Sequence, residues 1–305
     1  MAFTRNDLVE EVLLMCGGFI GDQELIGSLS GSLTDSATSF TVTGSVFGDS
    51  AVSGFQPGVI EVDHELMYVG AVNPSTGVFS NVIRGFRGTT AATHSSGAVV
   101  RDHPRVPRIQ VVRAINGCLT GLYPRLYGVA ETEITSTNFV YAYDIPATAV
   151  NVLAVALQEP DIASGYCQSR RWSFVTNATT ESTTGKQVFV ADHWSGSTIH
   201  VTYAIAPATF SEASGTNEDF ATATYLPEWT RELVTLGAAY RLIGMLDAGR
   251  LGERTAEGDL LAQVSPVGGA QKLGSFLYAQ FQEGLNAAEL RLRAQYDVGT
   301  IHYQW

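Results

Sequence analysis

Lysine and cysteine are scarce in this chain of 305 residues, and long apolar runs are missing. Lys186 and Lys272 are the two lysines, so nearly all positive charges are arginines, whose planar guanidinium suits fixed contacts with carboxylates or phosphates. The longest apolar run, Val150 to Leu157, is far shorter than the roughly 20 residues that span a bilayer. The opening MAFTRNDLVEEV also lacks a basic region followed by an apolar stretch, so we expect neither a membrane segment nor a secretion signal.

The cysteines and histidines are too dispersed to indicate a metal site or a covalent catalyst. The chain has three cysteines, Cys16, Cys118 and Cys167, which lie far apart in the sequence. Their odd number and wide spacing argue against a disulfide framework, and we expect reduced, buried side chains. Neither HExxH nor GxSxG occurs, and RGFRGTTAATHSSG lacks the lysine of a phosphate-binding loop. We therefore expect no catalytic residue, no metal and no cofactor.

Charge is unevenly distributed along the chain. The formal net charge of −12 argues against sequence-specific binding to DNA or RNA. Residues 1–80 carry ten acidic residues and one arginine, whereas residues 81–125 carry seven arginines and one aspartate. We predict that the arginine-rich stretch from Arg84 to Arg125 meets an acidic partner surface; the alternative is a set of solvated arginines in an arginine-rich composition.

Changes in sequence pattern divide the chain into five segments. Residues 1–27 and 106–130 each contain apolar residues at helical spacing, with capping signals at the start. Residues 28–105 form a predicted β-module and residues 131–210 a predicted sandwich-like β-module, because β-branched and aromatic runs there alternate with polar turns. Residues 211–305 contain two C-terminal helices and an aromatic tail.

This order of segments predicts an α+β fold. Four helices would form one small antiparallel bundle, and the two all-β modules would be inserted at its loop positions, where insertions are tolerated. The third helix carries a narrow apolar stripe that includes Trp229, Leu233 and Tyr240, and the fourth carries Phe281. Both helices therefore need a partner for their apolar faces.

One acidic cluster is a candidate for carboxylate chemistry. Glu61, Asp63 and Glu65 alternate along a predicted strand from Ile60 to Val69, which would place them on one face. Paired carboxylates catalyse glycoside hydrolysis, but adjacent like charges on a strand usually mark a solvated sheet edge. We favour the solvated edge.

The strongest motif follows this cluster and consists of Arg84, Gly85, Gly88, Thr89, His94 and Gly97. Its glycines can supply positive φ or close backbone approach, and its threonine and histidine side chains can satisfy buried loop amides. We expect His94 to be a packed, hydrogen-bonded residue rather than a base. The residues of this stretch follow the order V-x-RG and then GT-x-A-x-x-H-x-x-G-A-x-V. In this order the stretch resembles a β-module found in structural proteins of tailed bacteriophages.

The rest of the chain extends this resemblance. The stretches YAYDIP, VNVLAVAL, TGKQVFV and STIHVTYAIAP are similar to the β-domain of head-to-tail adaptor proteins, also called connector or head completion proteins, of long-tailed phages that infect actinobacteria. The resemblance implies a non-enzymatic homo-oligomeric ring of twelve copies. It also implies that the protein is made in the host cytoplasm and is located at the virion neck. There its partners would be the portal protein and a tail-side neck protein, either a stopper or a tail terminator, and double-stranded DNA would pass through the ring.

Candidate interface residues for such a ring combine aromatic, apolar and arginine side chains, the types enriched at interfaces. They are Arg105, Arg108, Trp229, Leu233, Tyr240, Phe281, Tyr303 and Trp305. Two alternatives stay open at this point. The first is a tail-tip or baseplate structural protein, since the motif also occurs there; the second is a carbohydrate-binding or hydrolytic β-domain on the virion, suggested by the acidic cluster together with Trp172 and Trp194.

Overall fold

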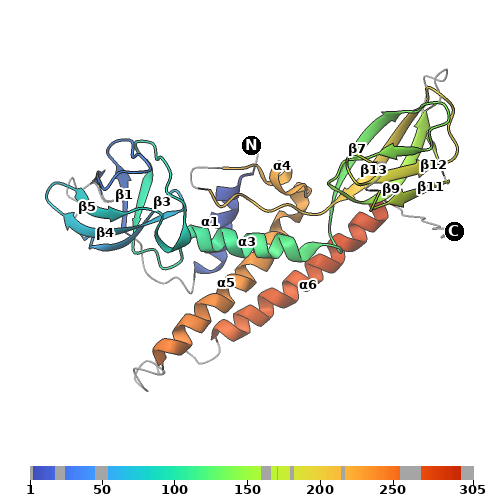
Figure 1. Cartoon of the computed structure of the whole chain (residues 1–305). Coiled ribbons are helices and arrows are strands. Elements are labelled where there is room, and N and C mark those ends of the chain that lie inside the picture. The colour runs from blue at the N-terminus through green and yellow to red at the C-terminus, as the bar shows by residue number, and fades with distance from the viewer. Residues whose placement is uncertain are drawn as a thin grey trace. The chain divides into compact units, whose positions relative to one another are not determined.

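The computed structural model describes residues 3–17, 25–44, 54–158, 166–169, 171–178, 182–213, 217–254 and 269–296 (Figure 1). These residues belong to two compact units. Unit 1 comprises residues 1–118, 209–220 and 231–281, and unit 2 comprises residues 119–208, 221–230 and 282–305. No helix within the described ranges is long and apolar enough to cross a membrane.

The β-structure of unit 1 is a closed barrel of six antiparallel strands in the order β1-β2-β5-β4-β3-β6. The strands are β1 (Leu25–Leu29), β2 (Ser39–Thr43), β3 (Gly58–Val62), β4 (Glu65–Asn73), β5 (Val78–Ile83) and β6 (Val99–Asp102), and the short 3-10 turn η1 (Phe86–Gly88) follows β5. The pairing of β6 with both β1 and β3 closes the barrel, so no strand edge stays unpaired. Apolar side chains such as Ile60, Met67 and Phe79 fill its interior.

The predicted strand from Ile60 to Val69 is wrong, because the chain reverses in the middle of it. Asp63 and His64 have φ values of 45° and 74° and form a two-residue turn between β3 and β4. Positive φ at both positions matches the right-handed twist of a hairpin. The pairing of Val62 with Glu65 across the turn replaces the single alternating strand that the sequence suggests.

Three helices, α1, α3 and α5, lie wholly or largely in unit 1. Helix α1 (Arg5–Met15) begins with the predicted capping box, in which the Asp7 carboxylate accepts from the Thr4 N–H at 2.9 Å and the Thr4 hydroxyl accepts from the Asp7 N–H. Helix α1 packs against α5 (Arg231–Arg254). Helix α3 (Arg108–Leu122) confirms the helix predicted there, and its apolar positions are buried.

The absence of a side chain at Gly237 lets three helices meet inside unit 1. A Cβ atom at this position would lie 2.4 Å from Cys118 Sγ of α3 and 2.8 Å from the ring of Phe281, in α6 (Gly269–Gln295). Burial raises the pKa of the Cys118 thiol to about 12, and the Cys16 thiol is also buried. Cys167 is exposed on a short strand, so the prediction of three buried cysteines is wrong for this residue.

The β-structure of unit 2 consists of two antiparallel sheets that share one core. The strands are β7 (Gly128–Thr135), β8 (Ala142–Asp144), β9 (Ala149–Gln158), β10 (Cys167–Gln168), β11 (Trp172–Val175), β12 (Gln187–Val190) and β13 (Thr198–Ile205). One sheet has the order β10-β9-β13-β7 and the other the order β11-β12-β8. Val155, Ile199 and Val201 from the first sheet and Val188 and Val190 from the second form the core between them. We call this part of unit 2 the sandwich.

The predicted architecture of a small helical bundle with inserted β-modules is wrong. The described chain is rich in β-structure, with a closed six-stranded barrel, two further sheets and five helices, of which four have at least seven residues. The remaining helical segments are short, α4 (Phe220–Thr224) and the 3-10 turn η2 (Glu228–Thr230). The physical reason is that the barrel and the sandwich each enclose an apolar core of their own, so neither depends on a bundle for burial.

Candidate functional site

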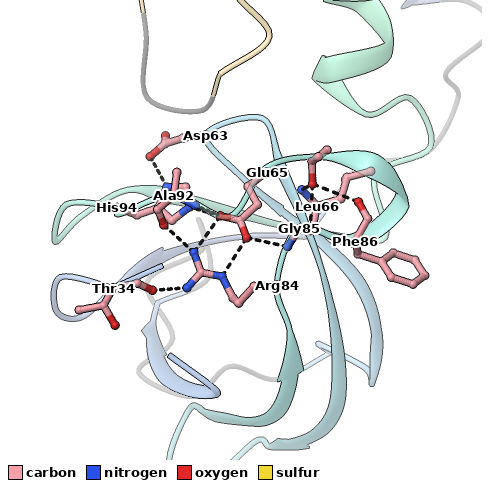
Figure 2. Close-up of polar contacts among 10 residues, drawn as sticks. Thr34, Asp63, Glu65, Leu66, Arg84, Gly85, Phe86, Ala92 and His94 are labelled. Atoms are coloured by element: carbon pink, nitrogen blue, oxygen red, sulfur yellow. Dashed lines mark hydrogen bonds and ion pairs between the residues drawn. The ribbon is translucent and has the colours of Figure 1, made fainter. Parts of the chain in front are cut away.

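The motif residues converge on one side of the barrel, next to the β3–β4 turn. Figure 2 shows the side chains of Asp63, Glu65, Arg84 and His94 directed toward one another. The Thr89 hydroxyl donates to the carbonyl of Leu66, the residue after Glu65, at 3.3 Å. We call Asp63, Glu65, Arg84, Thr89 and His94 the barrel network. Asp63 and Glu65 come from the turn and the start of β4, Arg84 follows β5, and Thr89 and His94 belong to the connection between β5 and β6.

Arg84 and Glu65 form a two-pronged ion pair at the centre of the barrel network. Arg84 Nε donates to Glu65 Oε1 and Arg84 Nη2 donates to Glu65 Oε2, both at 2.8 Å. Arg84 Nη2 also donates to the Ala92 carbonyl at 2.6 Å, and Nη1 donates to the Thr34 carbonyl. The planar guanidinium therefore joins three separate segments of the barrel, a task for which a lysine ammonium lacks the geometry.

The Glu65 carboxylate accepts further hydrogen bonds from the backbone. The N–H groups of Gly85 and Ala92 each donate to it at 3.0 Å, and His94 Nε2 lies 2.8 Å from Oε2. Burial raises the pKa of Glu65, but the hydrogen bonds from His94, Arg84, Ala92 and Gly85 outweigh it and lower this pKa to about 2. Glu65 is therefore a buried carboxylate that stays ionised.

His94 lies between two carboxylates. Its Nε2 faces Glu65, and its Nδ1 lies 3.0 Å from Asp63 Oδ2. Because an ionised carboxylate can only accept, both ring nitrogens must donate, which requires the imidazolium form. Burial lowers the pKa of His94, but the hydrogen bonds with Asp63 and Glu65 outweigh that effect and raise it above 6.5. The barrel network then balances two negative charges with two positive ones.

The motif glycines shape the backbone around the barrel network. Gly85, Gly88 and Gly97 have φ values of 61°, 79° and 84°. At Gly85 a Cβ atom would also lie 2.9 Å from the Thr89 carbonyl oxygen, so a side chain there meets both strain and a steric clash. The Thr89 hydroxyl accepts from the Leu66 N–H at 3.1 Å. It thereby joins the end of the motif to β4.

The burial of the barrel network limits what it can do chemically. The side chains of His94 and Glu65 have no exposed surface, and only 7% of the Arg84 side chain is exposed. A substrate would have to break these hydrogen bonds to reach the reactive atoms. The network is suited to holding the barrel closed, since it connects β4, the β3–β4 turn, the Thr34 segment and the β5–β6 connection.

The acidic cluster of residues 61–65 is not a solvated strand edge. Glu61 and Glu65 are buried, with 1% and 0% exposure. The Glu61 carboxylate accepts from the Arg108 N–H at 2.7 Å, at the first residue of α3, where negative charge is favoured. The sequence showed the regular spacing of Glu61, Asp63 and Glu65 upstream of the motif. It gave no local sign that Glu61 would contact Arg108 or that Glu65 would contact Arg84.

The uneven charge distribution is explained by ion pairs within the chain. Arg108 Nε donates to Glu10 at 3.0 Å and its Nη1 lies 3.6 Å from Glu61. The other pairs are Arg84 with Glu65, Arg101 with Glu10, Arg113 with Glu212, and Arg125 with Glu289. These five arginines thus have acidic partners within the chain, and a contact of the arginine-rich stretch with an acidic surface of the portal or of a neighbouring subunit stays a prediction.

The predicted interface residues that the structure describes differ in their exposure and in their neighbours. Leu233 is buried, and Trp229 is half-buried with the Arg291 guanidinium 4.5 Å from its ring centroid. Phe281 is also half-buried, whereas Tyr240 is 38% exposed and its ring lies 5.1 Å from that of Tyr278. Arg105 is exposed. Tyr303 and Trp305 lie outside the described residues.

Comparison with known proteins gives no family for this chain. No protein-family model matches it, and no curated protein sequence matches it. Among the described residues, no group of three or more histidine, cysteine, aspartate or glutamate side chains could hold a metal ion. The observations that bear on function are therefore the geometry of the motif and its resemblance to the β-module of phage structural proteins.

Proposed function

We propose that the chain is a structural protein of the head-to-tail junction of a tailed bacteriophage, an adaptor that forms a ring between the portal and the tail. The observation that carries this proposal is the burial of the motif. The residues that resemble the phage β-module, above all Arg84, Thr89 and His94, contribute their side chains to a closed barrel. They supply stability and shape, which an assembly protein needs, and they present no reactive group to solvent.

The composition also supports a role next to DNA without sequence recognition. Duplex DNA carries about one negative charge per 1.7 Å of its axis, and a basic lumen would bind it tightly. A chain with a net charge of −12 repels a polyanion, so DNA can slide past it. Five arginines of residues 84–125 are neutralised by carboxylates of the same chain and add little free positive charge.

Purified virions of the phage that encodes the chain provide the test. Quantitative mass spectrometry should find the protein in a fixed, ring-like ratio to the portal protein, and labelled antibodies should bind at the neck. Label at the distal end of the tail would replace this proposal with a tail-tip role. Absence of the protein from virions would eliminate both.

A further inference from the structure

The turn that follows β5 exposes one part of the motif while it buries another. Arg84 and Gly85 hydrogen-bond to the buried Glu65 carboxylate, whereas Phe86 is half-buried and Arg87 is exposed. Figure 2 shows the Phe86 ring directed away from the barrel network. The stretch RGFRGT therefore has two sides. One side holds the barrel closed, and the other faces solvent.

The solvent-facing side continues onto the neighbouring strands. The ring centroids of Phe86 and of Tyr68 on β4 are 5.7 Å apart, and Arg87 Cζ lies 5.6 Å from the centroid of the Phe86 ring. Tyr68 pairs with Ile83 of β5, so their side chains project from the same face of the barrel. Tyr68 and Ile83 are 39% and 57% exposed. We call Tyr68, Ile83, Phe86 and Arg87 the arginine–aromatic surface.

Two residues with left-handed backbone bring these side chains to the surface. Asn81 has a φ of 54°, and Phe79 and Val82 on either side of it both belong to the barrel core. Residues three apart in a regular strand face opposite sides, so the alternation shifts at Asn81 and Ile83 is turned outward. Arg87 has a φ of 53°, which is uncommon for a residue with a long side chain. Backbone strain of this kind is concentrated at binding sites.

The barrel network holds the turn that carries Phe86 and Arg87. The Gly85 N–H donates to the Glu65 carboxylate at 3.0 Å, and the Phe86 carbonyl accepts from the Thr89 N–H at 3.3 Å. The Thr89 hydroxyl is in turn hydrogen-bonded to β4. The arginine–aromatic surface is therefore preorganised, and a partner that binds it has little chain to immobilise.

Charge indicates the kind of partner. Five arginines of residues 84–125 pair with carboxylates of the chain, but among the described residues no carboxylate pairs with Arg87. The chain has 30 acidic residues, yet none lies in residues 66–100, which contain β5 and most of β4 and β6. An anionic partner would thus meet a guanidinium and no carboxylate of this segment. A guanidinium is suited to bind a carboxylate through two parallel hydrogen bonds.

The same observations favour an acidic protein segment over a nucleic acid. Bases can stack on exposed rings, but nucleic-acid binding also needs several cations that follow the phosphate backbone. The arginine–aromatic surface offers one cation, Arg87, on a chain with a net charge of −12. A protein segment that alternates carboxylates with apolar side chains matches one guanidinium beside two rings and an isoleucine.

We propose that the arginine–aromatic surface binds an acidic segment of another protein. An aspartate or glutamate of that segment pairs with Arg87, and a neighbouring apolar side chain packs against Tyr68 and Ile83. The inference narrows the acidic contact expected for residues 84–125 to one surface. It does not depend on the head-to-tail proposal, because a tail-tip protein could bind its partner in the same way.

Selection from a random peptide library tests the proposal, with the purified full-length chain as bait. The selected peptides should be enriched in aspartate and glutamate next to large apolar residues. Their affinities, measured by fluorescence anisotropy with synthetic peptides, should fall by roughly tenfold or more in Arg87→Gly. Glycine accepts the left-handed backbone at this position, so the variant should unfold at an unchanged or higher temperature.

Arg113→Ala is the matched control. It removes another exposed arginine of residues 84–125, one that pairs with Glu212 of the same chain, and it should leave peptide binding unchanged.

Two further variants separate charge from apolar contact. Arg87→Glu reverses the charge, so selection with this variant as bait should enrich lysine and arginine in place of acidic residues. Tyr68→Ser should weaken binding of the acidic peptides, while the preference for acidic over neutral peptides should persist because Arg87 remains.

Four results would overturn the proposal. The first is that no peptide is selected, and the second is a set of selected peptides without an excess of acidic residues. The third is binding that Arg87→Gly leaves intact. The fourth is that an oligothymidine probe binds more tightly than the acidic peptides and loses its affinity in Arg87→Gly, which would make the surface a nucleic-acid site. None of these results decides whether the protein is found at the virion neck.

Discussion

The barrel and the sandwich bury different kinds of polar groups. Among the described residues, the buried acidic and basic side chains belong to unit 1: Arg5, Glu61, His64, Glu65, His94 and Asp102. The buried polar side chains of the sandwich are uncharged: Ser136, Gln187, Ser197 and Thr202. The comparison teaches that the barrel depends on matched charges as well as on apolar packing, whereas the sandwich depends on apolar alternation. Buried charges must each have a partner, and they make stability depend on pH.

The largest effect is expected from Glu65→Ala in the barrel. The substitution leaves the Arg84 and His94 side chains buried without their shared carboxylate, which should cost about 3–5 kcal/mol of unfolding free energy. Hydrogen exchange read by mass spectrometry should show lost protection in residues 54–102 but not in residues 128–205. The control is Glu133→Ala, an exposed carboxylate on β7 of the sandwich. Equal effects of the two substitutions would contradict the comparison.

A large but purely apolar effect is expected in the sandwich. Ile199 is fully buried, and Ile199→Ala should cost about 2–4 kcal/mol through lost transfer energy and a cavity. The lost protection should now fall in residues 128–205, and the cost should be the same at every pH between 4 and 8. Ile83→Ala, which removes a 57% exposed side chain of β5, should change stability little. A cost for Ile199→Ala that depended on pH would show that buried charge matters in the sandwich too.

The stability of the barrel should vary between pH 4 and 8, whereas that of the sandwich should change mainly below pH 4, because hydrogen bonds from Thr183 lower the pKa of Asp144 on β8 from 3.8 to about 2. Because the pKa of His94 is raised above 6.5, its contribution is full below pH 6.5 and is lost as pH rises through the raised value. The pKa of Glu65 is lowered from 4.5 to about 2, so its contribution is full above pH 4.5 and is lost as pH falls toward 2. Burial lowers the pKa of His64 from 6.5 to about 4, so its contribution is full above pH 6.5 and is lost as pH falls toward 4. Barrel stability should therefore be highest near pH 6.5 and should decline on either side.

Nuclear magnetic resonance of the ring nitrogens provides the direct check of this pH dependence. At pH 6 both nitrogens of His94 should carry protons. In His94→Gln the decline of barrel stability above pH 6.5 should become shallower. His200 of the sandwich, whose ring is one-fifth exposed and pairs with Glu131 on one side only, is the matched control. A neutral His94 at pH 6 would refute the assigned imidazolium.

The smallest effect is expected from an ion pair on the sandwich surface. Arg171 lies 3.5 Å from Asp192, and their side chains are 76% and 50% exposed. Arg171→Ala should change the unfolding free energy by at most about 0.5 kcal/mol, since water and salt screen such pairs. Arg84→Ala in the barrel is the comparison, because it removes the same side chain type from a buried pair. A large cost for Arg171→Ala would remove the contrast between the two regions.

Several local elements were predictable from the sequence. The capping box at Thr4 and Asp7 and the helix that begins at Arg108 both follow from short-range signals, and both are present. The turn at Asp63 and His64 was missed, because neither residue is glycine or asparagine and the flanking pattern alternates like one strand. Cys167 was expected to be buried, but its strand has two residues and lies at a sheet edge.

The candidate site was predictable only in part. Arg84, Thr89 and His94 were recognisable as a motif, but their partner Glu65 lies 19 residues before Arg84 and 29 before His94. Pairing over such distances depends on strand register, which no local pattern contains. The contact between the Tyr141 and Phe189 rings was missed for the same reason, since the pairing of β8 with β12 brings these residues together.

The amino-acid sequence by itself determined which segments become helices and strands, where most glycine turns lie, and that the positive charges are arginines. These properties depend on neighbours within a few residues. The tertiary structure decided that the barrel closes, that its acidic and basic side chains neutralise one another inside it, and that seven large apolar side chains among the described residues of the sandwich remain exposed. Those outcomes depend on contacts between distant segments, and the free energy of burying a charge or a ring is defined only once its partners are in place.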